Sequence, residues 1–199
     1  MAKRNVGEKI FEAASRSFHE YGYNATGIQE IVDSAGVPKG SFYAHYKSKE
    51  ALGLEVLRID AEATLNSLVM NENSPALDSL KEHFRLLAND YYRFKYRSGC
   101  LVGDFASELA SNAKFRTASL AYMNAWAAKI EEALRIAQEA KEIPKQKDPA
   151  VLSRFLLAAF FGAALRIRLL KSLVPFEEFI EIAFGDLLIN SKQTAAKAK

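Results

Sequence analysis

One short basic stretch holds the residues of this 199-residue chain whose types and spacing could do chemistry. From Gly36 to Lys49 it carries Lys39, Lys47, Lys49 and His45 and no acidic residue. Ammonium groups without neighbouring carboxylates attract phosphate, and phosphate contacts supply much of the affinity of proteins for nucleic acid. The stretch therefore predicts a local surface for a polyanion.

The middle of this stretch is predicted to be a short helix that can enter a groove of DNA. Residues 36–38 form a tight Gly-Val-Pro turn, and its proline suits the first turn of a helix. The small side chains of Gly40 and Ser41 would let the backbone approach a partner, and Lys39, Ser41 and Tyr43 could then reach phosphates or base edges. A helical hairpin without a DNA partner would show the same turn, so this pattern alone leaves both interpretations open.

Two amphipathic helices are predicted before the turn. Apolar residues recur at intervals of three and four from Val6 to Tyr21, and again from Ile28 to Ala35. Thr26 and Gln29 fit a capping box, in which the Thr26 hydroxyl accepts from an early backbone N–H of the second helix. Three short helices with a glycine turn before the third form a helix-turn-helix pattern.

The rest of the chain is predicted to be helix after helix, without a strand or an internal repeat. We expect an all-α fold of nine helices, with a helix-turn-helix domain over residues 1–50 and a larger helical domain over residues 51–191. Residues 192–199 are expected to form a disordered basic tail.

Charge, cysteine content and hydropathy indicate where in the cell the protein works. The net charge of +3 belongs to the tail, because the remaining basic and acidic residues balance. A single cysteine excludes an intrachain disulfide and suits a cytoplasmic protein. The most apolar window, Phe155 to Leu165, is flanked by arginines and is too short for a membrane helix of about 20 residues. We therefore expect a cytoplasmic protein without a membrane partner.

The last two predicted helices carry a large apolar surface. Phe155 to Leu165 is apolar around most of its circumference, so it must be buried on several sides. With Phe176 to Leu188 it would form a four-helix bundle across a two-fold axis, which predicts a homodimer. The alternative is a monomer core, and a DNA-binding unit that profits from two half-sites favours the dimer.

Aromatic residues gather elsewhere in the larger domain, and a core rich in Tyr and Trp offers polar groups to an internal cavity. Arg166 and Arg168 interrupt an apolar helix, and we expect one of them to pair with Asp104 or Glu108. The alternatives are plain core packing for the aromatic residues and a structural ion pair for the arginine. The candidate ligand-binding residues are Tyr92, Phe105, Tyr122, Trp126 and Arg166.

Cys100 lies at the predicted start of a short helix. A helix N-terminus and nearby arginines lower the pKa of a thiol and favour a reactive thiolate. Cys100 is therefore a further candidate ligand-binding residue, as a sensor of electrophiles. A lone cysteine is more often a small buried apolar residue, and that alternative stays open.

No motif predicts catalysis, a metal site or a cofactor. His19, His45 and His83 lie far apart and form no ligand pair, and phosphate-binding loops and dinucleotide fingerprints are absent from the sequence. The remaining alternative to DNA binding is a protein-binding helical adaptor, which would have no need of the acid-free stretch from Gly36 to Lys49.

The amino-acid sequence of one segment points to a function more specifically than these patterns do. Residues 25–52, ATGIQEIVDSAGVPKGSFYAHYKSKEAL, resemble the TetR family of bacterial transcriptional regulators. The match covers about residues 6–55. The resemblance implies a helix-turn-helix domain on a larger domain that dimerises and binds a small effector. The partners it implies are a double-stranded operator, a small-molecule effector and a second copy of the chain, with release of DNA when the effector binds.

The resemblance also implies roles for single residues. Thr26 would cap the second helix beside a phosphate, and His45 and Lys49 would lie at the DNA backbone. Gly27 and Ala44 depart from the family pattern, which puts one phosphate contact and one base contact in doubt. The residues that would face the operator are Lys39, Gly40, Ser41 and Tyr43.

The segment around Cys100 carries a second resemblance. Gly99-Cys100-Leu101 is similar to a branch of the family that includes sensors of electrophiles, such as the repressor of N-ethylmaleimide reductase.

Overall fold

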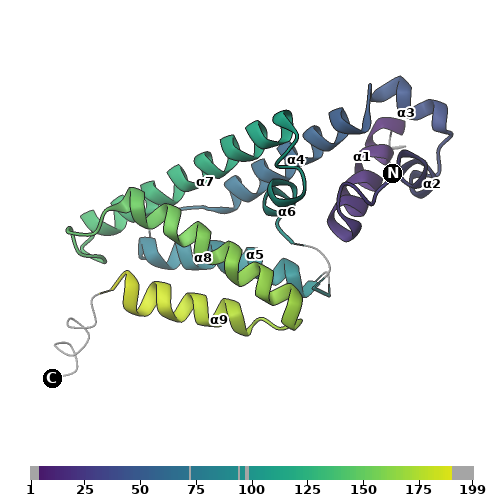
Figure 1. Cartoon of the computed structure of the whole chain (residues 1–199). Helices are drawn as coiled ribbons and strands as arrows, with labels where there is room; N and C mark the ends of the chain where they lie inside the picture. Colours follow the sequence, from purple (N-terminus) through teal and green to yellow (C-terminus); the bar gives the residue numbers. More distant parts are fainter. Residues whose placement is uncertain (1–4, 72, 94, 97–98, 190–199) are drawn as a thin grey trace. The chain divides into compact units, whose positions relative to one another are not determined.

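The computed structural model describes residues 5–71, 73–93, 95–96 and 99–189, and the regular structure of these residues is helical throughout (Figure 1). Its helices are α1 (Val6–Tyr21), α2 (Ile28–Ala35), α3 (Lys39–His45), α4 (Lys49–Ser67), α5 (Ala76–Arg93), α6 (Leu101–Glu108), α7 (Ala113–Glu139), α8 (Pro149–Leu170) and α9 (Val174–Glu181). After α9 the chain continues as a π-helical turn over Ile182–Leu187. The all-α prediction is confirmed for this part of the chain. The predicted basic tail, 192–199, lies outside the described residues.

Side chains fix several helix starts by accepting hydrogen bonds from backbone N–H groups that have no partner within the helix. Ser48 Oγ accepts from the N–H of Ala51 at the start of α4 (3.1 Å). Asn112 Oδ1 accepts from the N–H of Lys114 before α7 (3.0 Å), and Asp148 Oδ1 accepts from that of Ala150 in α8 (2.9 Å). Each cap of this kind stabilises a helix by about 0.5–2 kcal/mol.

The chain divides into two compact units, and each unit is made of two separate stretches of the sequence. The first consists of Met1–Ala63 and Arg97–Tyr122, and the second of Thr64–Tyr96 and Met123–Lys199. Helices α4 and α7 thus contribute residues to both units. Much of α4, all of α6 and the start of α7 belong with α1–α3, whereas the sequence places a domain boundary at residue 50.

An aromatic cluster forms the core of the first unit. Phe18 of α1, Tyr23, Phe105 of α6 and Phe115 of α7 contact one another with ring centroids 5.0–5.8 Å apart. Gly53 of α4 lies against this cluster. A Cβ at Gly53 would come within 2.7 Å of the Tyr23 ring and 3.0 Å of the Phe115 ring. The absence of a side chain at Gly53 therefore lets α4 pack directly on the aromatic rings.

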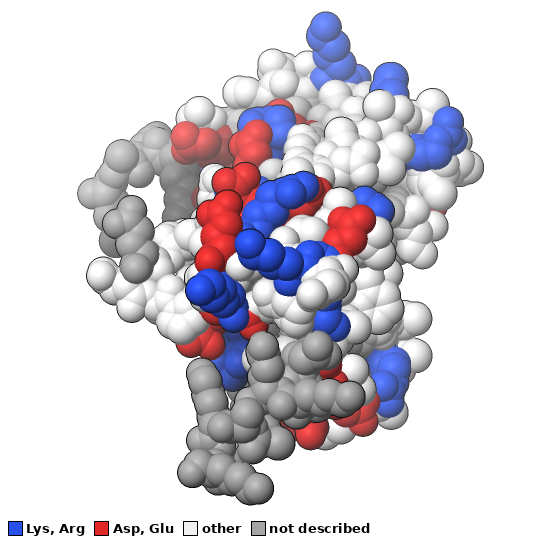
Figure 2. All heavy atoms as spheres, turned by 90° about the vertical axis from the view of Figure 1, so that its left-hand side faces the viewer, with Lys and Arg blue, Asp and Glu red and all other residues white. Residues whose placement is uncertain are grey.

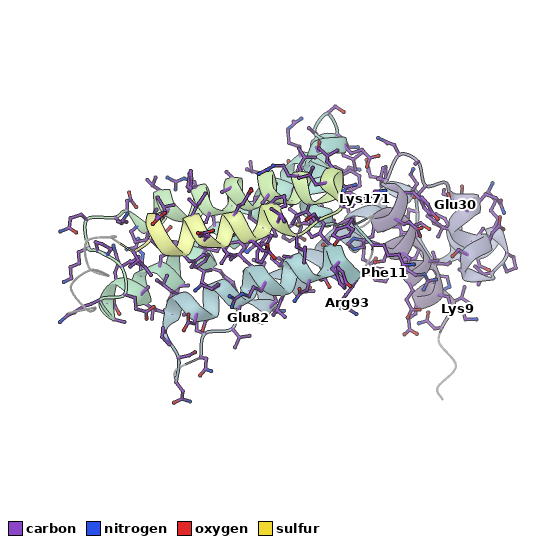
Figure 3. The ribbon with its side chains drawn as sticks, turned by 90° about the horizontal axis from the view of Figure 1, so that it is seen from below. Lys9, Phe11, Glu30, Glu82, Arg93 and Lys171 are labelled. Atoms are coloured by element: carbon purple, nitrogen blue, oxygen red, sulfur yellow. The ribbon has the colours of Figure 1, made fainter. Side chains whose placement is uncertain are left out.

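In the second unit, α8 packs against both α9 and α5 (Figure 1). Phe84 of α5 lies 5.2 Å from the ring of Phe160 in α8 and 5.1 Å from that of Phe179 in α9. Lys171, labelled in Figure 3, ends α8 in a left-handed conformation with φ 49°, and the chain then returns along α8 as α9. The core of this unit is therefore a layer of phenylalanines between three helices.

Helix α8 is longer than the apolar window that the sequence analysis considered. Its 22 residues are long and apolar enough to cross a membrane by length and composition alone, with a mean hydropathy of 1.7 over the best 18-residue window. The prediction that this region is too short is therefore wrong. However, 44% of that window is buried within the protein, and the core helix of a soluble protein passes the same test. The contacts of α8 with α5 and α9 agree with a core helix.

Replacement of Gly53 tests the packing of α4 on the aromatic cluster. Gly53→Ala should destabilise the protein by about 1–3 kcal/mol, because the added methyl group overlaps two rings. Gly40→Ala in α3 is the matched control, since a Cβ there meets no atom within 4 Å. It should leave stability unchanged or raise it by up to about 1 kcal/mol. Thermal unfolding measures both, and equal stability of the two variants would contradict the packing argument.

Candidate nucleic-acid interface and effector region

The turn between α2 and α3 has the geometry that the sequence predicts. Gly36 ends α2 with a left-handed φ of 65°, and its N–H points to the carbonyls of Val32 and Asp33. The N–H of Val37 also donates to the carbonyl of Val32 (3.0 Å). Pro38 follows in an extended conformation and precedes the first residue of α3. The positive φ favours glycine at position 36 because other side chains are strained there.

One side of α3 is anchored and the other faces solvent. Phe42 is fully buried and holds the helix against its neighbours, whereas 58% of the surface of Tyr43 is exposed. Lys39, Gly40 and His45 are exposed too, and Ser41 is half-buried. Within the described residues, beyond its chain neighbours and the backbone of its own helix, no atom lies within 4 Å of a Cβ at Gly40, so no such contact requires glycine there. The exposed side of α3 can therefore approach a flat or grooved partner closely.

The charge of this segment differs from that of other surface regions. No acidic residue lies between Gly36 and Lys49. By contrast, Lys and Arg side chains lie next to Asp and Glu on the face that Figure 2 shows. The basic character is therefore local, as the sequence predicts.

The predicted cap of the second helix by Thr26 is wrong. Thr26 is fully buried, and its hydroxyl donates to the carbonyl of Gly22 (2.7 Å) instead of capping α2. Gly27 is the residue that precedes α2, and it supplies no side-chain hydrogen bond. The side-chain amide of Gln29 donates to Asp33 (2.8 Å) and does not reach back. The hydroxyl therefore closes the end of α1, and a phosphate beside Thr26 stays a prediction.

Lys49 has internal partners that the prediction of a DNA contact did not include. Its Nζ donates to the carbonyls of Tyr23 (2.9 Å) and Thr26 (2.8 Å) and lies 4.2 Å from the centre of the Tyr23 ring. Burial lowers the pKa of Lys49, and the Glu108 carboxylate opposes that shift. With two carbonyls and a ring face around it, this ammonium group holds the loop between α1 and α2.

The six candidate ligand-binding residues fall in both units. Phe105 and Trp126 are buried in the aromatic cores, Tyr122 is half-buried and 65% of Tyr92 is exposed. The first unit holds Cys100, Phe105 and Tyr122, and the second holds Tyr92, Trp126 and Arg166.

Trp126 belongs to a buried polar chain that the sequence analysis missed. Its indole N–H donates to Nε2 of His83 (2.8 Å), and Nδ1 of His83 lies 2.9 Å from Oγ of Ser67. Ser67 in turn donates to the carbonyl of Thr64 (2.8 Å). Because Nε2 accepts a hydrogen bond, the ring proton lies on Nδ1, and Nδ1–H donates to Oγ of Ser67. Burial lowers the pKa of His83 to about 4, which keeps the ring neutral at physiological pH.

Of the two arginines for which the sequence predicts an ion pair, Arg166 pairs with a carboxylate of the neighbouring helix. Arg166 Nη1 lies 2.8 Å from Oε2 of Glu178 in α9, and not beside Asp104 or Glu108. Both residues line a groove of about 320 Å³ between α8 and α9, together with Phe155, Ala159, Gly162, Ala163, Pro175, Phe179, Ile182 and Ala183. Arg166 therefore belongs to the helix face for which the sequence predicts a second copy of the chain.

The surroundings of Cys100 oppose the formation of a thiolate. Cys100 does precede α6, as predicted. However, desolvation of its thiol, together with the carboxylates of Asp60 and Asp104, raises the pKa of Cys100 to about 12. A helix N-terminus lowers the pKa of a thiol, but here burial and nearby negative charge outweigh it. The thiol is protonated at neutral pH, contrary to the expectation for an electrophile sensor.

Two known families match the chain. The profile of the bacterial regulatory proteins of the tetR family matches residues 10–56, which contain α2, α3 and the turn between them. A tetracyclin repressor-like C-terminal domain matches residues 76–183. The chain belongs to the TetR family.

Relatives of this TetR-family protein extend over nearly its whole length. The HTH-type transcriptional repressor DhaR of Mycobacterium sp. (strain GP1) is 31% identical over 94% of this chain and 95% of its own. The repressor NemR of Escherichia coli (strain K12) is 26% identical over 88% of this chain and 90% of its own. A TetR regulatory protein from Rhodobacter sphaeroides has a similar structure, with a TM-score of 0.84 and 26% identity over 90% of this chain and 97% of that one.

These relatives decide between the alternatives that the sequence left open. They are transcriptional regulators that bind DNA, and the resemblance stated from the sequence is confirmed. The TetR-family protein is accordingly a ligand-responsive DNA-binding regulator, and not an enzyme or a helical adaptor.

Lys39, the first residue of α3, and Lys49, the first residue of α4, should respond differently to salt. Lys39→Met should lower the slope of log affinity against log salt by about one, as the loss of one phosphate contact predicts. Lys49→Met should weaken binding without changing that slope, because its ammonium group is occupied inside the protein. Titrations of a random-sequence duplex at several salt concentrations measure both slopes. A lower slope for Lys49→Met would indicate instead that Lys49 contacts a phosphate.

Proposed function

We propose that this TetR-family regulator is a cytoplasmic repressor that binds a near-palindromic operator as a homodimer and is released by a small effector. The observation that carries the proposal is the solvent-facing, acid-free side of α3, which lies next to a buried anchor at Phe42. A helix of this kind fits the major groove of B-DNA, where each base pair presents a distinct pattern of donors and acceptors.

The exposed residues of α3 divide into two kinds of contact. Tyr43 and Ser41 carry hydroxyl groups that can bond to base edges or phosphates, and Lys39 and His45 supply positive charge for the DNA backbone. Gly40 lets the helix backbone come close to the groove floor. Thr26 and Lys49 act from within, because they fix the loop before α2 rather than the DNA.

The homodimer proposal rests on an apolar face that the monomer leaves exposed. In α8, 52% of Phe155 is exposed, and in the π-helical turn 60% of Ile182 is exposed. Gly162 is exposed between them on the groove of α8 and α9. Apolar patches of this kind on a folded chain mark interaction surfaces. A second copy would cover this face and set two copies of α3 about one helical turn of DNA apart, roughly 34–36 Å.

The effector is proposed to be a small molecule that binds without covalent reaction. The protonated thiol of Cys100 disfavours an electrophile, and Arg166 is assigned to the dimer face. In the first unit Phe105 and Tyr122 stay candidate contacts, and in the second unit Tyr92 and Trp126 do. The A-factor receptor protein of Streptomyces griseus, 30% identical over 78% of this chain and 52% of its own, is named as a receptor. To act as a switch, the effector must favour the DNA-incompetent state by about 1–3 kcal/mol.

Selection from a random duplex library tests the DNA-binding proposal. The wild-type protein should enrich a near-palindromic sequence, because a dimer presents two related copies of α3. Tyr43→Ala should bind the enriched duplex more weakly, by about 1–3 kcal/mol if Tyr43 reads a base. Tyr21→Ala is the control, since Tyr21 is exposed at the end of α1. If no sequence is preferred over random DNA, the operator proposal fails.

A bulky residue in the groove of α8 and α9 tests the dimer. Gly162→Trp should yield a folded monomer, because a Cβ at Gly162 meets no atom of its own chain within 4 Å. Glu82→Trp on the exposed side of α5 (Figure 3) is the control and should leave the dimer intact. Sedimentation equilibrium gives the mass of each variant. A Gly162→Trp dimer with an unchanged dissociation constant would place the interface elsewhere.

A further inference from the structure

The loop between α1 and α2 is held from two sides by ionised side chains. Glu108, the last residue of α6, accepts hydrogen bonds from the backbone N–H groups of Tyr23 (2.9 Å) and Asn24 (2.6 Å). Lys49, the first residue of α4, donates to the carbonyls of Tyr23 and Thr26. A carboxylate thus takes the free donors of the loop, and an ammonium group takes its free acceptors.

The backbone of this loop is shaped for the carboxylate. Gly22 ends α1 with φ 85°, a conformation that favours glycine. A Cβ at Gly22 would stand 3.1 Å from Oε2 of Glu108. The residue that turns the chain out of α1 therefore also makes room for Glu108.

Three neighbouring positions on one face of α6 interact with the end of α1 and the residues that follow it, Phe105 and Glu108 by contact and Asp104 through its charge. Against desolvation, which lowers it, the pKa of His19 in α1 is raised mainly by the hydrogen-bonded Asp60, and the Asp104 carboxylate adds to this shift. The ring of Phe105 packs 5.8 Å from Phe18 and 5.7 Å from Tyr23. Glu108 completes this face one turn further along. All of these residues belong to the first unit.

We propose that Glu108 is a positioning residue for DNA binding: it fixes the loop that sets α2 and α3, and so makes operator affinity depend on the place of α6. Lys49 is its counterpart on the opposite side of the loop. This inference rests on the proposed function and adds a specific link to it. A displacement of α6 would withdraw two acceptors from the loop and free α2 to move.

A second glutamate in the chain provides a matched control. Glu142 accepts from the N–H groups of Ala76 (2.8 Å) and Leu77 (2.9 Å) at the start of α5, in the second unit. Glu108 and Glu142 therefore make the same pair of contacts in different places. Glu→Gln at either position replaces one acceptor oxygen by an amide that donates, and this amide faces a backbone N–H with which it cannot pair.

The experiment compares E108Q and E142Q in the full-length protein, with the duplex that the wild-type protein selects from a random library as the probe. Both variants should unfold at a lower temperature than the wild type. At a temperature at which both are folded, E108Q should bind the duplex about tenfold more weakly than wild type, as the loss of one charge-assisted hydrogen bond predicts. E142Q should bind like the wild type.

The direction of the effect separates positioning from simple electrostatics. Removal of a negative charge near DNA would strengthen binding, so a general charge effect predicts tighter binding by E108Q. Equal or tighter binding by E108Q than by E142Q would overturn the proposal and leave the proposed function intact. Failure of the wild-type protein to select any duplex would instead count against the proposed function.

Hydrogen exchange gives a readout that needs no DNA. The amides of Tyr23 and Asn24 should exchange faster in E108Q than in the wild type, with the amides of α5 unchanged. E142Q should show the reverse. Should E108Q not fold, E108D keeps the charge but shortens the side chain, and the same order of affinities and exchange rates is expected. Unchanged exchange at Tyr23 and Asn24 in a folded variant would contradict the proposal.

Discussion

Backbone groups at the ends of helices have no partner within the helix, and this constraint joins parts of the chain that are distant in sequence. Ionised side chains from distant parts of the sequence supply the missing partners. Glu108 and Lys49 do so for the loop after α1, and Glu142 does so for the start of α5. Because each joins two elements with a charge, an independent shift of the helices would leave exposed or partly buried donors and acceptors without these partners, which is costly where water cannot replace them.

Local sequence patterns were sufficient to predict the helices and part of the candidate interface. The apolar spacing of α1 and α2 and the glycine at position 36 depend on neighbours within one or two turns, so the sequence predicts them. The exposure of Lys39 and Tyr43 follows from the burial of Phe42 on the other side of a short helix. These features need only the period of the helix and the conformational preference of glycine.

The side-chain contacts that could not be predicted from the sequence depend on partners in the folded structure. Thr26 fits a capping box, but its hydroxyl donates to the carbonyl of Gly22, and α2 has no side-chain cap. Lys49 follows a basic run, yet its ammonium group is taken by carbonyls more than twenty residues away. Arg166 pairs within the hairpin of α8 and α9, and the carboxylates near Cys100 come from α4 and α6. No pattern along the sequence states which distant group will reach such a side chain first.

A change of side chain at Gly40 would alter the candidate recognition surface without disturbing the packing of the fold. Since no atom of the protein surrounds that position, a new side chain there would meet only what lies outside the molecule. Selection on DNA preference can therefore act at Gly40 without first repairing stability, whereas the same change at Gly53 is blocked by two aromatic rings. If α3 reads DNA as proposed, a lineage with this scaffold can change its target sequence by single substitutions at Gly40 at little cost in stability.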